Sequence, residues 1–532
     1  MRRPLLAHVA GAVVAGVLAL GIGVPWWALL REAGAGAGWG VLVEERILGR
    51  LAYTAGQAFA STLLAVLLGL PAAIAFGTVR VPGARVWRAL FTVPFVMPSV
   101  VAAIALLAWV GPRGLLPLDL RDTIWIVLLA HATYNVGIVV RVVGGYLEGL
   151  APRLHEAAAV LGAHGWARLL RVTLPVAAPA VLAAATLVFV FCFTSFGVIM
   201  ILAPAPAFAT LEVEVYRAAA RRVDLVEAAA LATLQLVVVM SLVVLYTRWQ
   251  RGLAHRVQRS AAPPPPPRGR ASWALVGVSV ALAGIATLAP PAALAVQAFI
   301  PPGASAPTLA AFEGVMGRSS VIGLTDGQSA LRNSLAIASA ATALALLLGT
   351  TAAYAIVRGG WTALDALTLL PLATSAVTLG LGVLLSYPGV AAAPAAIPVA
   401  HALLAFPFVA RVLVSGWRGL EGSLAPAAAS LGASPARTLW RVELPLLAPA
   451  ILSATGFALA ISLGEFGATL VLRRPETATL PIAIFERLGR PGAAHYAEAL
   501  ALAFVLLALT AMVVLLFEIL ARRRGGAVAG EL

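Results

Sequence analysis

Long apolar runs alternate with short polar segments along almost the whole chain. Each run is about 20 residues or longer, which is enough for an α-helix to cross a bilayer, and the segments between them are rich in arginine, glycine and proline. We therefore predict an all-α polytopic membrane protein with about 12 transmembrane helices. The expected spans are residues 5–30, 55–77, 89–110, 123–145, 175–202 and 226–247, followed by 273–298, 333–357, 364–386, 395–416, 445–472 and 496–520.

The pattern is duplicated, because short motifs in the first half return at a fixed distance in the second. The motif at residues 156–162 and 172–175 reappears at residues 427–432 and 442–445. Gly162 and Gly432, and likewise Pro175 and Pro445, are 270 positions apart. His131 and His401 share this spacing, as do Phe196-Gly197 and Phe466-Gly467, whereas Leu68-Gly69 and Leu348-Gly349 are 280 positions apart. We predict two tandem homologous domains, residues 1–247 and 273–532, joined by a linker at 248–272.

Composition narrows the function class. Hydrophobic residues make up 61% of the chain and charged residues 11%, as in membrane proteins. The chain has no lysine, so all 37 basic residues are arginine, and a phosphate-binding loop of the Walker type requires a lysine. If ATP drives this protein, another subunit therefore hydrolyses it. Cys192 is the only cysteine, which excludes disulfides and cysteine-rich metal sites.

The net charge of +15 reflects membrane orientation rather than a nucleic-acid partner. The arginine excess lies in the linker and in the loops on the same side of the membrane as the N-terminus. The positive-inside rule identifies that side as cytoplasmic, and both termini are expected there. The linker also carries prolines at 263–267. A semi-rigid extended spacer is the favoured interpretation, and an SH3-type ligand is the alternative.

Three segments need a more specific prediction. Residues 5–30 are long enough for a retained signal-anchor, which we favour over a cleaved signal peptide. Pro94 and Pro98 break the third span, and prolines inside a span are expected in the bundle interior, where neighbours satisfy the freed backbone groups. The charged stretch with Glu212, Glu214 and Arg217 is expected to be an external loop.

The repeated motif carries the strongest functional signal. An Ala-rich run favours helix, glycine permits a bend, and Leu-Pro opens the next span, where the fixed φ of proline suits a first helical turn. At these residues the chain resembles the permease subunits of ATP-binding-cassette importers, whose coupling loop reads Glu-Ala-Ala, three residues, Gly, nine residues, Ile, one residue, Leu-Pro. Val172 takes the isoleucine place in the first copy, and Pro426 takes the place of the acid in the second.

The resemblance implies a type I importer permease fold in a bacterial cytoplasmic (inner) membrane, with two cytoplasmic ATPase subunits and an extracytoplasmic substrate-binding protein as partners. The chain would bind no cofactor, because ATP would bind the ATPase subunits, and it would not itself be an enzyme. The residues carried over as the ATPase-coupling site are Glu156, Ala157, Ala158, Gly162, Leu174, Pro175, Ala427, Ala428, Gly432, Leu444 and Pro445.

Candidates for the substrate pathway are fewer. Glu465 is the only acid placed within a predicted span away from its ends, and an intramembrane carboxylate is by default a functional candidate, with a structural hydrogen bond as the alternative. His131 and His401 are expected in helix packing or hydrogen bonding, because neither has a second histidine at metal-ligand spacing. The remaining pathway candidates are Tyr134, Asn135, Ser195, Phe196 and Phe466, although aromatic residues in apolar helices are commonly packing residues.

Among permeases with two fused domains, the chain most resembles those for thiamine or thiamine pyrophosphate, and next those for ferric iron; another ion or a polyamine remains a possible substrate. The stretches that carry this resemblance include 128–135, 191–196, 209–216 and 462–467. An ion-coupled secondary transporter is the alternative from a different class. Such a transporter would use intramembrane acids or bases and interrupted helices at the midplane, and the sequence offers one candidate acid.

Overall fold

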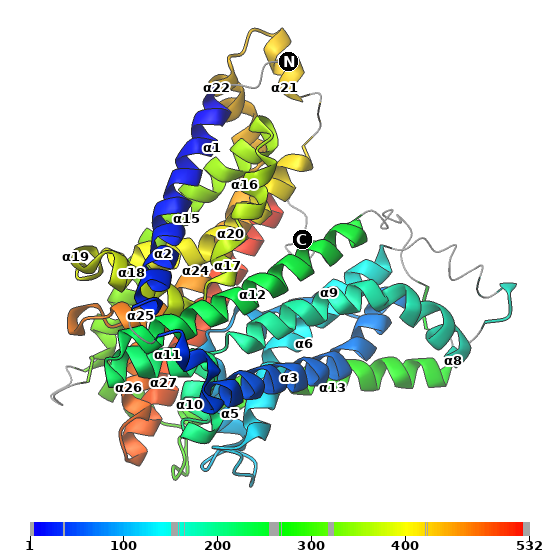
Figure 1. Cartoon of the computed structure of the whole chain (residues 1–532). Coiled ribbons are helices and arrows are strands. Elements are labelled where there is room, and N and C mark those ends of the chain that lie inside the picture. The colour runs from blue at the N-terminus through cyan, green and yellow to red at the C-terminus, as the bar shows by residue number, and fades with distance from the viewer. Residues whose placement is uncertain are drawn as a thin grey trace.

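All regular structure in the described part of the chain is helical, as predicted (Figure 1). The computed structural model describes residues 5–35, 38–149, 158, 160–163, 165–254, 265–267, 269–317, 324–420, 422 and 424–524. The main helices of the first half are α1 (Leu5–Leu18), α2 (Val24–Ala33), α3 (Glu45–Thr78), α4 (Ala84–Val96), α5 (Ser99–Val110), α6 (Ile124–Glu148), α8 (Gly165–Arg168), α9 (Leu174–Phe193), α10 (Gly197–Leu202), α11 (Leu211–Arg217) and α12 (Leu225–Ala254).

The second half repeats this order of helices. Its helices are α13 (Arg270–Phe299), α14 (Ala310–Met316), α15 (Gly327–Gly359), α16 (Thr362–Leu367), α17 (Leu370–Ala373), α18 (Ala376–Ser386), α19 (Pro388–Ala391), α20 (Ala396–Arg418), α21 (Leu424–Ser430), α22 (Pro435–Thr438), α23 (Leu444–Leu446), α24 (Ala448–Gly464), α25 (Gly467–Leu472), α26 (Leu480–Leu488) and α27 (Ala493–Arg523).

Most predicted spans are single helices. Within the described residues, nine helices are long and apolar enough to cross a membrane, and the pair Pro435–Leu446 and Ala448–Gly464, bent by 70°, makes a tenth. The other two predicted spans, 89–110 and 364–386, are present as consecutive shorter helices. Pro98 and Ser375 adopt extended backbone immediately before α5 and α18, and this interrupts each span.

The second span begins ten residues earlier than predicted, at Glu45 rather than at residue 55. Charged side chains in its first turns lowered the apolar signal that we used to place its start. Arg46 and Arg50 lie against Glu214 of α11, and Arg46 donates a 2.6 Å hydrogen bond to Glu227 of α12. The start of α3 is therefore a polar helix end that packs on charged partners of its own half.

The two halves exchange their first helices. In Figure 1, α1 runs beside α15 of the second half, and α13 runs beside α3 and α5 of the first half. The exchange is close, since a Cβ built on Gly11 of α1 would lie 2.5 Å from the Trp361 ring. The tandem order in the sequence therefore produces two interlocked bundles rather than two separate ones.

The bundles meet at one end and diverge toward the other. Figure 1 shows α5, α10, α11, α18, α25 and α26 where the bundles meet, and α8 and α21 at the far ends of the two diverging arms. We call the meeting region the junction. Its core contains buried residues from both halves, among them Ile104, Ile199, Val377 and Ile482.

Candidate functional site

The second copy of the repeated motif is a helical elbow built around a glycine. The helix α21 ends at Ser430, Gly432 takes a left-handed backbone with φ of +79°, and the Ala433 N–H donates back to the Ala428 carbonyl over 3.0 Å. Left-handed backbone strains any residue with a Cβ, so the position requires glycine. The Ser434 hydroxyl then accepts the Arg437 N–H at 3.3 Å and starts α22.

The described part of the first copy repeats this geometry. Gly162 has φ of +77°, and the Ala163 N–H donates to the Ala158 carbonyl over 2.9 Å. Glu156 and Ala157, the two remaining motif residues of this copy, lie outside the described residues. The bend predicted for both glycines is thus confirmed, and the structure brings the two motifs into matching elbows.

The two elbows join their spans differently. In the first half, a π-helical turn, Leu169–Thr173, leads without a break into α9. In the second half, the turn Leu439–Glu443 leads into the short α23, and a bend of 70° separates α23 from α24. Leu174-Pro175 and Leu444-Pro445 directly follow these turns. A displacement of the first elbow is therefore passed directly to α9, and one of the second elbow reaches α24 through the bend.

The outer face of each elbow is apolar and exposed. Val160 and Leu161 are 87% and 85% exposed, and Leu431 is 89% exposed, whereas Ala158 and Ala428 point inward and are buried. Pro426 and Ala427 are exposed on the outer face of the second elbow. The neighbouring helices α8 and α21 lie at the far ends of the diverging arms (Figure 1), so both elbows present a small apolar surface away from the bundles.

The second elbow is anchored by an ion pair whose carboxylate is buried. The Glu443 carboxylate accepts hydrogen bonds from the Arg358 guanidinium of α15 and, over 3.1 Å, from the Trp417 indole of α20. Thr173 occupies the matching position of the first half, 270 residues earlier. We call the ion pair of Glu443 and Arg358, together with the Trp417 indole that also donates to Glu443, the hinge pair. It ties the second elbow to two helices of its bundle.

At the junction, aromatic rings from the two halves stack on each other. The Phe196 and Phe466 ring centroids are 5.6 Å apart and nearly parallel. Tyr216 packs on Phe196 at 5.4 Å, and Phe485 packs on Phe466 at 5.3 Å, so each half contributes a matching pair. We call these four side chains the ring stack. The glycines that follow Phe196 and Phe466 allow close packing, since a Cβ on Gly197 would lie 2.6 Å from Ser99 and one on Gly467 would lie 3.1 Å from Ala376.

Glu465 stabilises a helix end in this structure. Its carboxylate accepts the Ala468 and Thr469 N–H groups at 3.1 Å each, at the start of α25, and lies 3.2 Å from His401 Nε2. This is the structural hydrogen bonding considered as the alternative for Glu465. Ser195 occupies the matching position in the first half, and its role in the pathway, like that of Glu465, remains a prediction.

The other pathway candidates lie inside the first bundle. The Tyr134 hydroxyl donates to the Met97 carbonyl, and the Asn135 amide donates to the His131 carbonyl over 2.8 Å. His131 Nδ1 is 2.9 Å from the Ser61 hydroxyl, an interhelical hydrogen bond of the kind predicted. No group of three potential metal ligands occurs among the described residues.

The sequence analysis missed the burial of Glu212. The predicted external loop contains the short helix α11, in which Glu212 is 1% exposed and accepts a hydrogen bond from the Gln235 amide. Burial raises the pKa of its carboxyl to about 7 despite nearby donors, which include the Ser375 hydroxyl and the Val377 N–H of the second half. The spacing of Leu211 and Val215, one helical turn apart, was the available signal for a buried helix.

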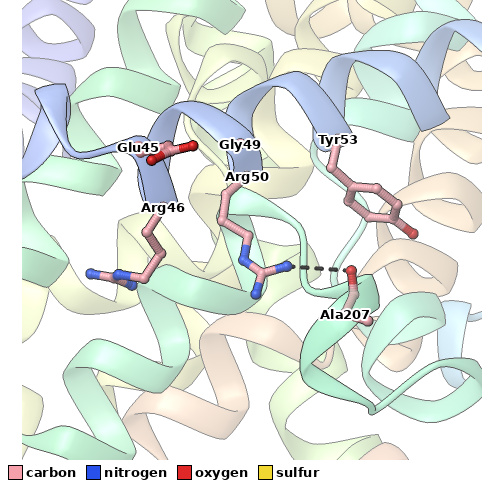
Figure 2. A pocket seen from close by; sticks show the side chains of 6 residues that line it. All are labelled: Glu45, Arg46, Gly49, Arg50, Tyr53 and Ala207. Carbon is pink, nitrogen blue, oxygen red and sulfur yellow. Dashed lines mark hydrogen bonds between the residues drawn. The ribbon is translucent and has the colours of Figure 1, made fainter.

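A shallow cavity of about 500 Å³ lies at the start of α3, at the opposite end of that helix from the first elbow (Figure 2). Its lining includes Arg46, Arg50, Tyr53 and Ala207. Arg50 donates to the Ala207 carbonyl over 3.3 Å (Figure 2), and both arginines lie near Glu214. Because protein carboxylates already neutralise the guanidinium groups, the cavity is not a free anion site.

Comparison with known proteins decides the family. Residues 49–259 and 345–526 match the family described as "Binding-protein-dependent transport system inner membrane component". The chain belongs to this family. The permease therefore contains two copies of the family domain, in agreement with the internal repeat, and it is a membrane-embedded transport component.

Two relatives span nearly the whole permease. It is 28% identical to the thiamine transport system permease protein ThiP of Brucella abortus (strain 2308) over 518 residues, 92% of each chain. It is 26% identical to ThiP of Escherichia coli (strain K12) over 463 residues, 81% of this chain and 82% of that one. A shorter relative, the putative 2-aminoethylphosphonate transport system permease protein PhnV of Salmonella typhimurium, is 35% identical over 208 residues, 37% of this permease and 76% of that protein.

Proposed function

We propose that this chain is the transmembrane permease of an ATP-binding-cassette importer for thiamine or thiamine pyrophosphate. The similarity to ThiP over 92% of the chain supports this substrate class, because it includes both domains and the junction between them. In this proposal a binding protein delivers the substrate at the junction end. Ferric iron and 2-aminoethylphosphonate are the alternative substrates.

In the same proposal the two elbows dock two cytoplasmic ATPase subunits. Their exposed apolar side chains at the ends of the diverging arms support this role, since exposed apolar patches on membrane-distal loops mark protein contacts. Movement of the ATPases toward each other would draw the arms together about the junction. The first elbow would pass this movement to its span through a continuous helix, and the second through the bend before α24.

Uptake by the reconstituted complex tests the proposal. The permease is placed in proteoliposomes with its ATPase subunits and binding protein, and uptake of radiolabelled thiamine, thiamine pyrophosphate, ferric iron and 2-aminoethylphosphonate is measured with and without ATP. We expect ATP-dependent uptake of thiamine or its pyrophosphate. Uptake at full rate without the ATPase would identify an ion-coupled transporter, and uptake of another substrate alone would reject the thiamine assignment.

A further inference from the structure

Two buried carboxylates from different halves lie near each other at the junction. Glu212 belongs to α11 of the first half, and Glu465 precedes α25 of the second half; their charges are close enough to interact. Glu465 is compensated by His401 and by the start of α25. Glu212 has no cationic partner among its described contacts, so its charge is the one that lacks compensation.

Two acceptor oxygens at Glu212 lack a regular hydrogen bond. Gln235 donates its amide N–H to one Glu212 oxygen, and the Gln235 carbonyl oxygen has no hydrogen-bond partner. The Ser375 hydroxyl and the Val377 N–H lie near the carboxylate, but its second oxygen makes no hydrogen bond of normal geometry with them. The Gln235 side chain is 1% exposed. The hydroxyl of Thr378, next to Val377, is also buried and unpaired. Buried acceptors left unpaired cost free energy, and a ligand that brings donors would satisfy them.

Aromatic rings adjoin the same place. Tyr216 follows Glu212 by one helical turn on α11 and packs on Phe196, while Phe466 follows Glu465 directly and stacks on Phe196. The faces of aromatic rings attract cations, and more strongly where water is excluded. The ring stack and the uncompensated carboxylate are therefore suited to the same kind of ligand.

The fold does not require these acids. Alignment of Thr210-Leu211 with Thr479-Leu480 is supported by equivalent hydrogen bonds, from Leu211 N–H to Thr54 over 2.9 Å and from Leu480 N–H to Ser334 over 2.8 Å. In this alignment Pro481 takes the place of Glu212. The second half thus builds the same short helix without a carboxylate, so the acid in the first half has a role other than folding.

We propose that Glu212, the Gln235 carbonyl and the ring stack form a binding site for an organic cation that carries an amino group. The amino group would donate to the unpaired oxygens, and the positive charge would lie between the carboxylate and the ring faces. This inference rests on the proposed function and deepens it, because thiamine is such a cation. The junction would then select the charge of the substrate at the point where the two halves part.

A ligand-binding titration of the whole complex in lipid nanodiscs tests the site. The thermal unfolding midpoint is followed against thiamine, choline and the neutral aminopyrimidine half of thiamine, for wild type and for Glu212→Gln, Glu212→Asp and the control Glu476→Gln. We expect thiamine to bind the wild type, Glu212→Asp and Glu476→Gln with similar affinity. Glu212→Gln should bind about tenfold more weakly or worse, and so should the neutral compound to the wild type.

The other outcomes are equally decisive. Equal affinity of Glu212→Gln and wild type, or the absence of any cation-dependent shift in the wild type, overturns the site; Glu212 is then a protonated acid paired with the Gln235 amide. Binding of choline without thiamine, lost in Glu212→Gln, overturns the amino-group recognition and rejects thiamine as the substrate, because choline has no N–H donor. The site and the proposed function can therefore fail separately.

Discussion

The two halves of the permease share a backbone and differ in their buried polar groups. Both elbows turn at a left-handed glycine, and the helix pairs α3–α6 and α15–α20 cross at glycines that face matching valines, Val139 and Val409. At the hinge, however, Glu443 of the second half corresponds to Thr173 of the first. Positions set by steric fit were retained after duplication, and so was the buried pair His131 and His401, whereas other buried polar positions, such as Thr173 and Glu443, diverged.

This difference gives the two elbows different mechanical properties. The second elbow lacks the motif acid, since Pro426 stands in its place, but the hinge pair anchors it to α15 and α20. The first elbow carries Glu156 in its sequence and has no matching ion pair at Thr173. We infer that the first elbow relies on contact with its ATPase and the second on internal attachment.

The largest expected effect is on coupling at the elbow surfaces. Leu161→Arg and Leu431→Arg place a charge on an exposed apolar surface, so we expect each to lower ATP-driven uptake about tenfold or more without changing the unfolding midpoint. Glu156→Arg should be comparably harmful, and Pro426→Arg less so. Uptake and ATP hydrolysis in proteoliposomes measure the effect. Leu118→Arg, an exposed leucine between α5 and α6, is the control, and equal uptake by all variants would remove the elbows from coupling.

The hinge pair should give the next largest effect. Glu443→Ala leaves Arg358 and Trp417 without their acceptor, and we expect a loss of about 2 to 3 kcal/mol in the free energy of unfolding. Thr173→Ala in the first half should cost less than about 1 kcal/mol. Thermal and denaturant unfolding of the purified permease measure both. If the two variants cost the same, the halves are not anchored differently; Glu443→Gln, which keeps an acceptor, should lie between the wild type and Glu443→Ala.

The glycine crossings should respond alike in both halves. A Cβ on Gly69 would lie 2.9 Å from Val139, and one on Gly349 would lie 2.5 Å from Val409. Gly69→Ala and Gly349→Ala should each destabilise by about 1 to 2 kcal/mol, because β-branched valines cannot move aside cheaply. Gly56→Ala, on the same helix as Gly69 but in open space, should be neutral or stabilising. A cost confined to one half would contradict the shared backbone.

The smallest effect is expected at an ion pair that both halves contain, but with the acid and the arginine exchanged between the two partner positions. Arg88 pairs with Glu148 over 2.8 Å in the first half, and Asp365 pairs with Arg418 over 3.2 Å in the second. These side chains are largely exposed, so Glu148→Ala should cost about 0.5 kcal/mol or less. Asp365→Ala should cost more, since Asp365 also accepts from Arg411 over 3.0 Å. Unfolding midpoints at low and high salt measure both, and an opposite ranking would show that the second arginine adds nothing.

Periodicity and the repeat were sufficient to predict the helical class, the two tandem domains and the elbows. A helix that crosses a lipid bilayer must be apolar over its whole length, so each span is visible in the sequence. A left-handed turn requires glycine, so the turns at Gly162 and Gly432 are visible as glycines in the repeated motif. The same signal placed the start of α3 at residue 55 and the segment around Glu212 in a loop. A charged side chain lowers the average hydropathy of a segment whether it is buried against a partner or exposed to water. The sequence pattern therefore could not distinguish these two cases.

Helix length, proline position and glycine backbone are local properties, so the amino-acid sequence alone specifies what each segment can become. Which segments meet depends on the folded chain: α1 lies on the second half, Phe196 stacks on Phe466, and Glu212 approaches Glu465 at the junction. These contacts join residues hundreds of positions apart, and their free energy depends on burial and on partners that no local pattern specifies.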